Sequence, residues 1–220
     1  MSTSSADSPR SPGDDSPALD PAERRRILWV LLVPLFMSLI SVSIVNVALS
    51  SIQQDLEASS SALQWVLTGY ALAFGVLLVA SGRAGDVFGR RKLFIAGIAV
   101  FAGASLLCGL APNTTVLNIG RVIQGLGSGM LNPQTVGMIQ EYFQGRERAK
   151  AFGLFGSVVG VAVAIGPTLG GLLIQVLGPD AGWRSTFLLN VPIAALAIVL
   201  AFLWLPRRSR RPGKVDMDPL

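Results

Sequence analysis

Six long apolar segments, separated by short polar stretches, dominate the hydrophobic pattern of the chain. They cover residues 27–49, 63–81, 93–111, 115–139, 151–177 and 186–205. Each holds about 20 residues or slightly more, and a helix of that length crosses a hydrocarbon core about 30 Å thick. Because lipid cannot pair with backbone polar groups, the pattern predicts transmembrane helices and not isolated strands.

The pattern therefore predicts an all-α membrane protein, a bundle of six transmembrane helices. Residues 1–22 are rich in Ser, Pro, Asp and Gly, and we expect a disordered cytoplasmic tail because so few apolar side chains cannot offset the entropy of ordering. The six-helix transmembrane domain is predicted over residues 23–206. Residues 207–220 are expected to be a basic cytoplasmic linker that is cut short, although a natural C-terminus is the alternative.

The basic residues predict the orientation of the bundle. Lys and Arg gather before the first segment, between the second and third, between the fourth and fifth, and after the sixth. The other three connections carry Arg184 together with Asp55, Glu57 and Asp180. Since basic residues favour the cytoplasmic side, we expect a multi-pass protein of the plasma (inner) membrane with both termini in the cytoplasm.

Composition excludes several classes of protein. Charged residues make up 14% of the chain, against about a quarter in soluble domains, and 51% of residues are hydrophobic. The net charge of +5 comes from bases beside apolar segments, so we expect the lipid bilayer as a partner and no nucleic acid. With no histidine and only Cys108 as a thiol, we expect no enzyme, no catalytic residue and no metal site.

Arg121 is the charged residue that lies deepest in an apolar segment. A charge in a membrane span is costly unless it meets a partner or a wet cavity, and it marks a functional site by default. Polar residues recur around it at three- or four-residue spacing and share one helix face, which predicts a face turned into the bundle or a water-filled path: Asn118, Gln124, Ser128, Asn132 and Thr135. Snorkelling of Arg121 to a headgroup, or a bond to a carbonyl, is the structural alternative.

Two further sets of residues at helical spacing, one polar and one small, indicate a function less strongly than the face of Arg121. Ser43, Asn46 and Ser50 share a face of the first segment, which suits either a polar path or hydrogen bonds between helices. The fifth segment carries small residues at four-residue spacing in two series, which predicts close helix packing: Gly156, Gly160 and Ala164, and Ala162, Gly166 and Gly170.

Four stretches resemble signatures of the major facilitator superfamily. Residues 82–92, GRAGDVFGRRK, resemble the loop signature G-x-L-x-D-r-x-G-r-r-r, with Ala84 in place of the usual Leu. Residues 121–127, RVIQGLG, are similar to R-x-x-Q-G-x-G, and residues 166–171, GPTLGG, are similar to the antiporter pattern G-P-x-x-G-G. Residues 44–49, IVNVAL, resemble T-I-V-N-V-A-L-P of the 14-helix drug:proton antiporters of the EmrB/QacA type.

The resemblance implies one half of a major facilitator fold, the N-terminal half, built as a 3+3 repeat. It implies a secondary active transporter, with proton-coupled export of small organic or drug-like compounds across the plasma membrane and no cofactor beyond the proton gradient. The small-molecule substrate would bind against a second six-helix half, either a missing C-terminal portion or a partner chain. The alternative is a truncated or half-size chain that transports nothing on its own.

The resemblance also implies roles for three sets of residues. The transport and coupling set is Arg121, Gln124, Asn118 and Asn46. The cytoplasmic loop latch is Gly82, Asp86, Gly89, Arg90 and Arg91, and the antiporter helix motif is Gly166, Pro167, Gly170 and Gly171.

One departure from the family pattern affects proton coupling. Ser41 stands where the antiporter branch usually carries Asp, and Ser50 replaces the closing Pro. Asp86 and Glu147 are expected in loops, so no carboxylate is expected within the six spans. Proton coupling then either lies in a second half or uses a different mechanism.

Overall fold

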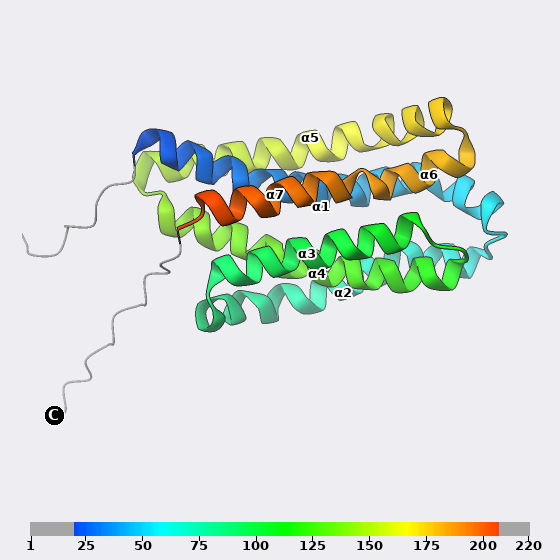
Figure 1. Cartoon of the computed structure of the whole chain (residues 1–220), viewed down its shortest axis with the longest axis horizontal. Helices are drawn as coiled ribbons and strands as arrows, with labels where there is room; N and C mark the ends of the chain where they lie inside the picture. Colours follow the sequence, from blue (N-terminus) through cyan, green and yellow to red (C-terminus); the bar gives the residue numbers. More distant parts are fainter. Residues whose placement is uncertain (1–19, 207–220) are drawn as a thin grey trace, which may run out of the picture.

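The structure, a computed structural model, describes residues 20–206, and these form seven helices and no strand (Figure 1). In chain order the helices are α1 (Pro21–Asp55), α2 (Ser60–Phe88), α3 (Arg90–Gly109), α4 (Thr114–Tyr142), α5 (Gly145–Leu177), α6 (Pro179–Leu188) and α7 (Asn190–Trp204). The helix α1 begins inside the last residues of the predicted tail. The rest of that tail and the predicted linker lie outside the described residues.

Helices α6 and α7 together make the sixth span, Pro179–Trp204, so the six predicted spans are confirmed as elements. The interruption falls at Leu189, and Pro192 follows within one turn. Proline has no N–H and cannot complete the helical hydrogen bond to the carbonyl four residues earlier, which accounts for a break at this point. Five spans are long and apolar enough to cross a membrane, and α4 is less apolar because it carries the polar series around Arg121.

Most helices extend beyond the predicted apolar segments, so two predicted loop positions are wrong. Asp86 lies in the last turn of α2, and Glu147 lies in the first turn of α5. The predicted loop between the second and third spans shrinks to Gly89, whose φ of +94° suits glycine. Helical hydrogen bonding continues past the apolar stretch because it does not depend on lipid, so hydropathy underestimates helix length.

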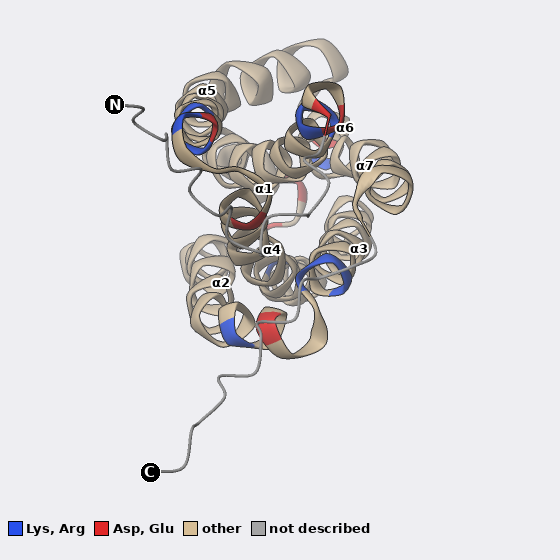
Figure 2. Ribbon diagram, turned by 90° about the vertical axis from the view of Figure 1, so that its left-hand side faces the viewer, with Lys and Arg blue, Asp and Glu red and all other residues tan. Residues whose placement is uncertain are grey.

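Packing pairs the spans in a repeated way. Helix α4 packs against α2 and α3, whereas α1 packs against α5 and the α6–α7 span (Figure 2). In a 3+3 repeat the fourth span is equivalent to the first, the fifth to the second and the sixth to the third. The contacts of α4 with α2 and α3 then correspond to the contacts of α1 with α5 and with the α6–α7 span. The pairing is the one expected for a 3+3 repeat, and the six-helix fold class is confirmed.

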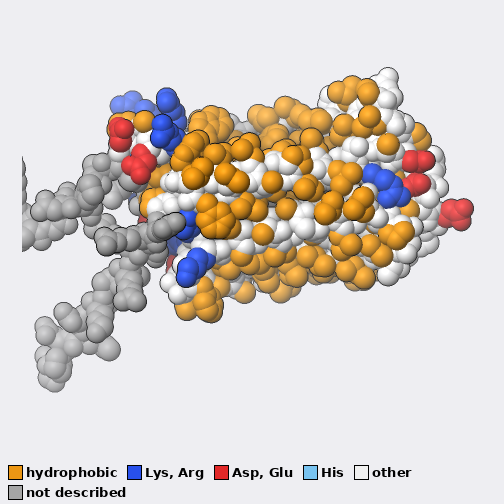
Figure 3. Space-filling model, in the orientation of Figure 1, with side chains coloured by type: hydrophobic (Ala, Val, Ile, Leu, Met, Phe, Trp, Pro, Cys, Tyr) orange, Lys and Arg blue, Asp and Glu red, His pale blue; other side chains and the backbone are white. Residues whose placement is uncertain are grey.

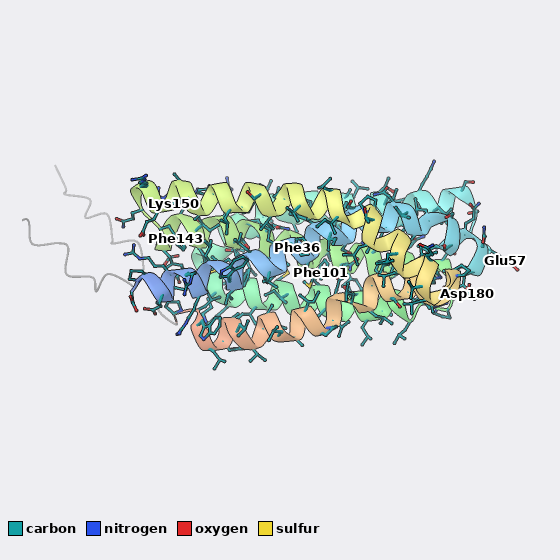
Figure 4. The ribbon with its side chains drawn as sticks, turned by 90° about the horizontal axis from the view of Figure 1, so that it is seen from above. Phe36, Glu57, Phe101, Phe143, Lys150 and Asp180 are labelled. Carbon is teal, nitrogen blue, oxygen red and sulfur yellow. The ribbon has the colours of Figure 1, made fainter. Side chains whose placement is uncertain are left out.

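Charged side chains gather at the two ends of the bundle, and apolar side chains cover its flank (Figure 3). Lys150 and Phe143 lie at one end, and Glu57 and Asp180 lie at the other (Figure 4). We call the first of these the basic end, because Arg24, Arg90 and Arg148 also lie there. Arg24 pairs with Glu147, and Arg91 Nη2 donates to the Phe202 carbonyl at 3.0 Å, so the alternate connections predicted to share one side do so.

Only one of the two small-residue series on α5 makes a close helix contact. A Cβ at Gly166 would lie 2.6 Å from Ser43 Cβ, and one at Gly170 would lie 2.8 Å from Ile44 Cγ1, both on α1. Nothing outside α5 among residues 20–206 lies within 4 Å of a Cβ at Gly156 or Gly160, so the close contact predicted for their series is not made within this half. The two series lie on different faces of α5, and α1 covers one of them.

Candidate functional site

Arg121 lies seven residues into α4, about 10 Å along the helix axis, and is fully buried. Its Nε donates to the Val66 carbonyl on α2 at 2.9 Å, and its Nη1 donates to Gln124 Oε1 at 2.6 Å. The arginine therefore bridges α2 and α4 through neutral acceptors. The carbonyl bond proposed as the structural alternative is present, together with a polar cluster that extends beyond it.

Aromatic rings cover the guanidinium on two sides. Its carbon lies 4.3 Å from the ring centroid of Tyr70 and 5.8 Å from that of Phe187, both within the range of a cation–π interaction. The Tyr70 hydroxyl makes a 2.6 Å hydrogen bond with Ser128 Oγ and donates to the Ser38 carbonyl at 3.3 Å. Sequence reasoning missed Tyr70, although a tyrosine within an apolar segment is a signal, since a buried hydroxyl needs a partner.

Gln124 extends the cluster to two more helices. Its Nε2 donates to Ser105 Oγ on α3 at 2.7 Å and to Ser41 Oγ on α1 at 3.3 Å. Both serines are buried. Ser41, at the position where an aspartate was expected from the resemblance, thus supplies a neutral acceptor to the cluster.

A cavity of about 1030 Å³ lies beside this cluster. It is bordered by α1, α2, α4 and α5, with Arg90 of α3 at its edge, and runs from Arg121 to Arg90 and Gln140 at the basic end. Its walls are mostly apolar, with polar side chains at a few positions. The apolar side chains include Leu35, Leu39, Val42, Leu67, Phe74 and Phe155, and the polar ones include Ser38, Asn46, Tyr70 and Asn132.

The structure brings together some members of the predicted transport set. Arg121 and Gln124 are bonded to each other, and Asn46 lies on the cavity wall, where its Nδ2 donates to the Val42 carbonyl at 3.0 Å. Asn118 instead donates to the Ala62 carbonyl at 3.2 Å, which joins α4 to α2 away from the cavity lining.

The predicted latch residues separate into two groups. Arg90 pairs with Asp86 at 2.9 Å across the α2–α3 junction, and Gly82 and Arg90 border the cavity. Arg91 turns the other way, toward the Phe202 carbonyl and ring on α7. The junction is therefore tied to both the cavity and the sixth span.

A second polar cluster, not anticipated from the sequence, joins α1, α6 and the connection between α3 and α4 at the end opposite the basic end. Asp55 Oδ2 accepts from Trp183 Nε1 at 3.0 Å and from Arg184 Nη2 at 2.9 Å. Arg184 Nη1 also donates to the Ala111 carbonyl at 2.8 Å. In the sequence, the adjacent Trp183 and Arg184 could have indicated this cluster. Their partners could not be identified, because they lie more than 70 residues away in the chain. Within residues 20–206 no group of three or more metal-ligating side chains forms.

Comparison with solved structures shows the same fold. One similar structure is the major facilitator superfamily proton:xylose symporter XylE bound to 6-bromo-6-deoxy-D-glucose, with a TM-score of 0.74 and 15% identity over 83% of this chain and 45% of that chain. Another is tetrameric PepTSo2, with a TM-score of 0.68 over 83% of this chain and 40% of that chain. At this low identity the likeness concerns the fold alone.

Curated relatives are closer in sequence. A Streptomyces coelicolor protein described as a probable actinorhodin transporter is 40% identical over 94% of this chain and 36% of its own length. The methylenomycin A resistance protein of Bacillus subtilis is 41% identical over 86% of this chain and 39% of its own length, and the puromycin resistance protein pur8 of Streptomyces alboniger is 42% identical. The chain thus spans little more than a third of the length of these relatives.

The family model of the Major Facilitator Superfamily matches residues 31–219, which is most of the chain. That match agrees with the six-span fold and with the order of the four signatures along the sequence. The chain is a multi-pass membrane protein that belongs to the Major Facilitator Superfamily.

Proposed function

We propose that the chain is one half of a secondary active transporter that exports small organic compounds across the plasma membrane. The main support is the apolar cavity of about 1030 Å³ with a fully buried arginine in its wall. Pockets of this size and character suit organic ligands, and a charge inside a membrane span is rarely without a role. The names of the relatives, which are resistance and export proteins, point in the same direction.

We place the basic end in the cytoplasm, because Lys and Arg favour that side of a membrane. The cavity then extends from the cytoplasmic end to mid-bundle, and none of its lining residues comes from the Asp55–Arg184 cluster at the far end. That arrangement suits loading of substrate from inside the cell.

A second six-helix half is part of the proposal. Transporters of this kind bind substrate between two repeats near the middle of the membrane. Helices α2 and α5, which border the cavity, also expose large apolar side chains on its wall, including Leu78 on α2 and Val163 on α5. The alternative, a truncated chain that takes no part in transport, is the contrary outcome of the export experiment.

We propose the proton gradient as the energy source, with the titratable carboxyl group outside this half. Among residues 20–206, the acidic side chains lie near helix ends, and none borders the cavity. Arg121 and Gln124 would then position the substrate or respond to a proton site across the interface between the halves.

The test is export by cells that lack their own efflux pumps. One strain would express this chain alone, and a second would express it with a separately encoded C-terminal half from the Streptomyces coelicolor relative. We expect lower retention of a fluorescent organic compound only in the second strain, and restored retention after a protonophore. Unchanged retention in both strains, with both polypeptides in the membrane fraction, would contradict the proposal, and export by the chain alone would remove the need for a second half.

A further inference from the structure

We infer that this cavity takes an organic anion with an apolar body and discriminates against lipophilic cations. The inference rests on the proposed transport function and narrows its substrate class. It comes from the charges that border the cavity, and from where the acidic residues of the described chain lie.

Both charged side chains on the cavity wall are arginines, Arg90 and Arg121. Arg90 is paired with Asp86. Arg121 has no acidic partner, since the ion pairs among the described residues are those of Arg24, Arg90 and Arg184. Its contacts are the Val66 carbonyl, the Gln124 amide oxygen and two aromatic faces, all of them neutral. A positive charge without a counter-ion therefore stands in the inner wall.

The acidic residues of the described chain lie elsewhere. Glu57 and Asp180 are at the end opposite the basic end, and Asp55 is held there by Arg184 (Figure 4). The remaining acidic residues sit at the starts or ends of helices, and none borders the cavity: Asp20, Glu23, Asp86, Glu141 and Glu147. Among residues 20–206, no carboxylate is placed to receive a cationic ligand in this cavity.

The rest of the wall suits an amphiphilic anion. Leucine, valine and phenylalanine side chains supply apolar surface for a hydrocarbon or aromatic body. Asn46 is exposed on the wall. One of its two amide N–H groups donates to the Val42 carbonyl, so the second is available to a ligand oxygen. Asn132 adds a further amide on the same wall.

The apolar surroundings decide how far the charge of Arg121 acts. Charges in a medium of low dielectric constant are poorly screened, and a cleft lined by one sign of charge concentrates ligands of the other. An anion of a given shape should therefore bind at least about tenfold more tightly than a cation of the same shape.

The experiment uses three dansyl probes that share a fluorophore and differ in charge: dansylglycine (anion), dansylglycinamide (neutral) and dansylethylenediamine (cation). Binding to the purified 220-residue chain in phosphatidylcholine nanodiscs is followed by saturable fluorescence enhancement, with empty nanodiscs as the blank. Asn46→Asp places a carboxylate on the wall, and Gln175→Glu makes the same chemical change at an exposed position of α5 that does not border the cavity.

We expect the order anion, neutral, cation in the unmodified chain and in Gln175→Glu, and a shift toward the cation in Asn46→Asp. Circular dichroism melting checks that Asn46→Asp folds; if it does not, Asn132→Asp replaces it. Equal affinity for all three probes, or a preference for the cation, would overturn the inferred preference for anions. It would not contradict the proposal that the cavity binds organic compounds. Absence of saturable binding by any probe would overturn the inference that this half holds the anion, whereas the proposed transport function is tested separately by export in the two-half strain.

Discussion

Arg121 Nη1 and Gln124 Oε1 are joined by a 2.6 Å hydrogen bond, one turn apart on α4. The spacing of three residues places both side chains on one face of the helix. Gln124 then donates to serines on α1 and α3, while Arg121 donates to a carbonyl on α2. The pair therefore links α1, α2, α3 and α4. Movement of any one of these helices would change the hydrogen bonds of the Arg121–Gln124 pair.

Substitution of Arg121 tests its role in transport. In the two-half transporter, Arg121→Ala should abolish export while the protein still inserts into the membrane. Arg121→Lys should restore little, because one ammonium group cannot reproduce the separate Nε and Nη1 bonds. Retention of a fluorescent compound and the amount of protein in the membrane fraction are the measurements. Exposed Arg83→Ala is the control, and normal export by Arg121→Ala would remove Arg121 from the transport machinery.

Two glycine substitutions test the close approach of α3 and α4. A Cβ at Gly127 would lie 2.6 Å from the Phe101 backbone nitrogen, so Gly127→Ala should separate the helices and lower the free energy of unfolding by about 1–3 kcal/mol. Gly103 on α3 faces open space. Gly103→Ala should raise the free energy of unfolding by up to about 1 kcal/mol, because alanine has the higher helix propensity. Denaturant unfolding in detergent measures both changes, and effects of the same sign would contradict the close approach of α3 and α4 at Gly127.

The adjacent glycines of the antiporter motif provide a matched pair. A Cβ at Gly170 would lie 3.1 Å from the Ile44 carbonyl, whereas Gly171 faces open space. Gly170→Ala should therefore lower the melting temperature, and Gly171→Ala should leave it unchanged or raise it. If Gly171→Ala also lowered export by the two-half transporter without changing stability, its face of α5 would be assigned to the interface with the second half.

Substitution of Asp86, which pairs with Arg90, should affect transport without affecting stability. Both side chains are partly exposed, at 59% and 29%, so Asp86→Asn should change the free energy of unfolding by less than about 1 kcal/mol. If the pair holds one access state, export should nevertheless fall, because the pair must form and break as the halves move. Unfolding and export are measured on the same preparation, with Glu141→Gln as the control. Unchanged export would leave the pair without a role in the transport cycle.

The sequence by itself determined the membrane class, the six spans and which connections share an end of the bundle. These follow from local properties, the length of an apolar run and the placement of Lys and Arg. It also determined that Arg121, Gln124 and Ser128 face the interior of the bundle, because a helix repeats every 3.6 residues. Helix ends were predicted less well, as Asp86 and Glu147 show, because helical hydrogen bonds continue past the apolar run.

The tertiary structure alone decided which side chains meet. Ser41 reaches Gln124 from 83 residues away, and Tyr70 covers Arg121 from another helix. Gly156 and Gly166 belong to series with the same spacing, yet only Gly166 meets α1. Periodicity defines the faces of a helix but not the neighbour that packs on each face, and that choice depends on the summed packing of all six spans.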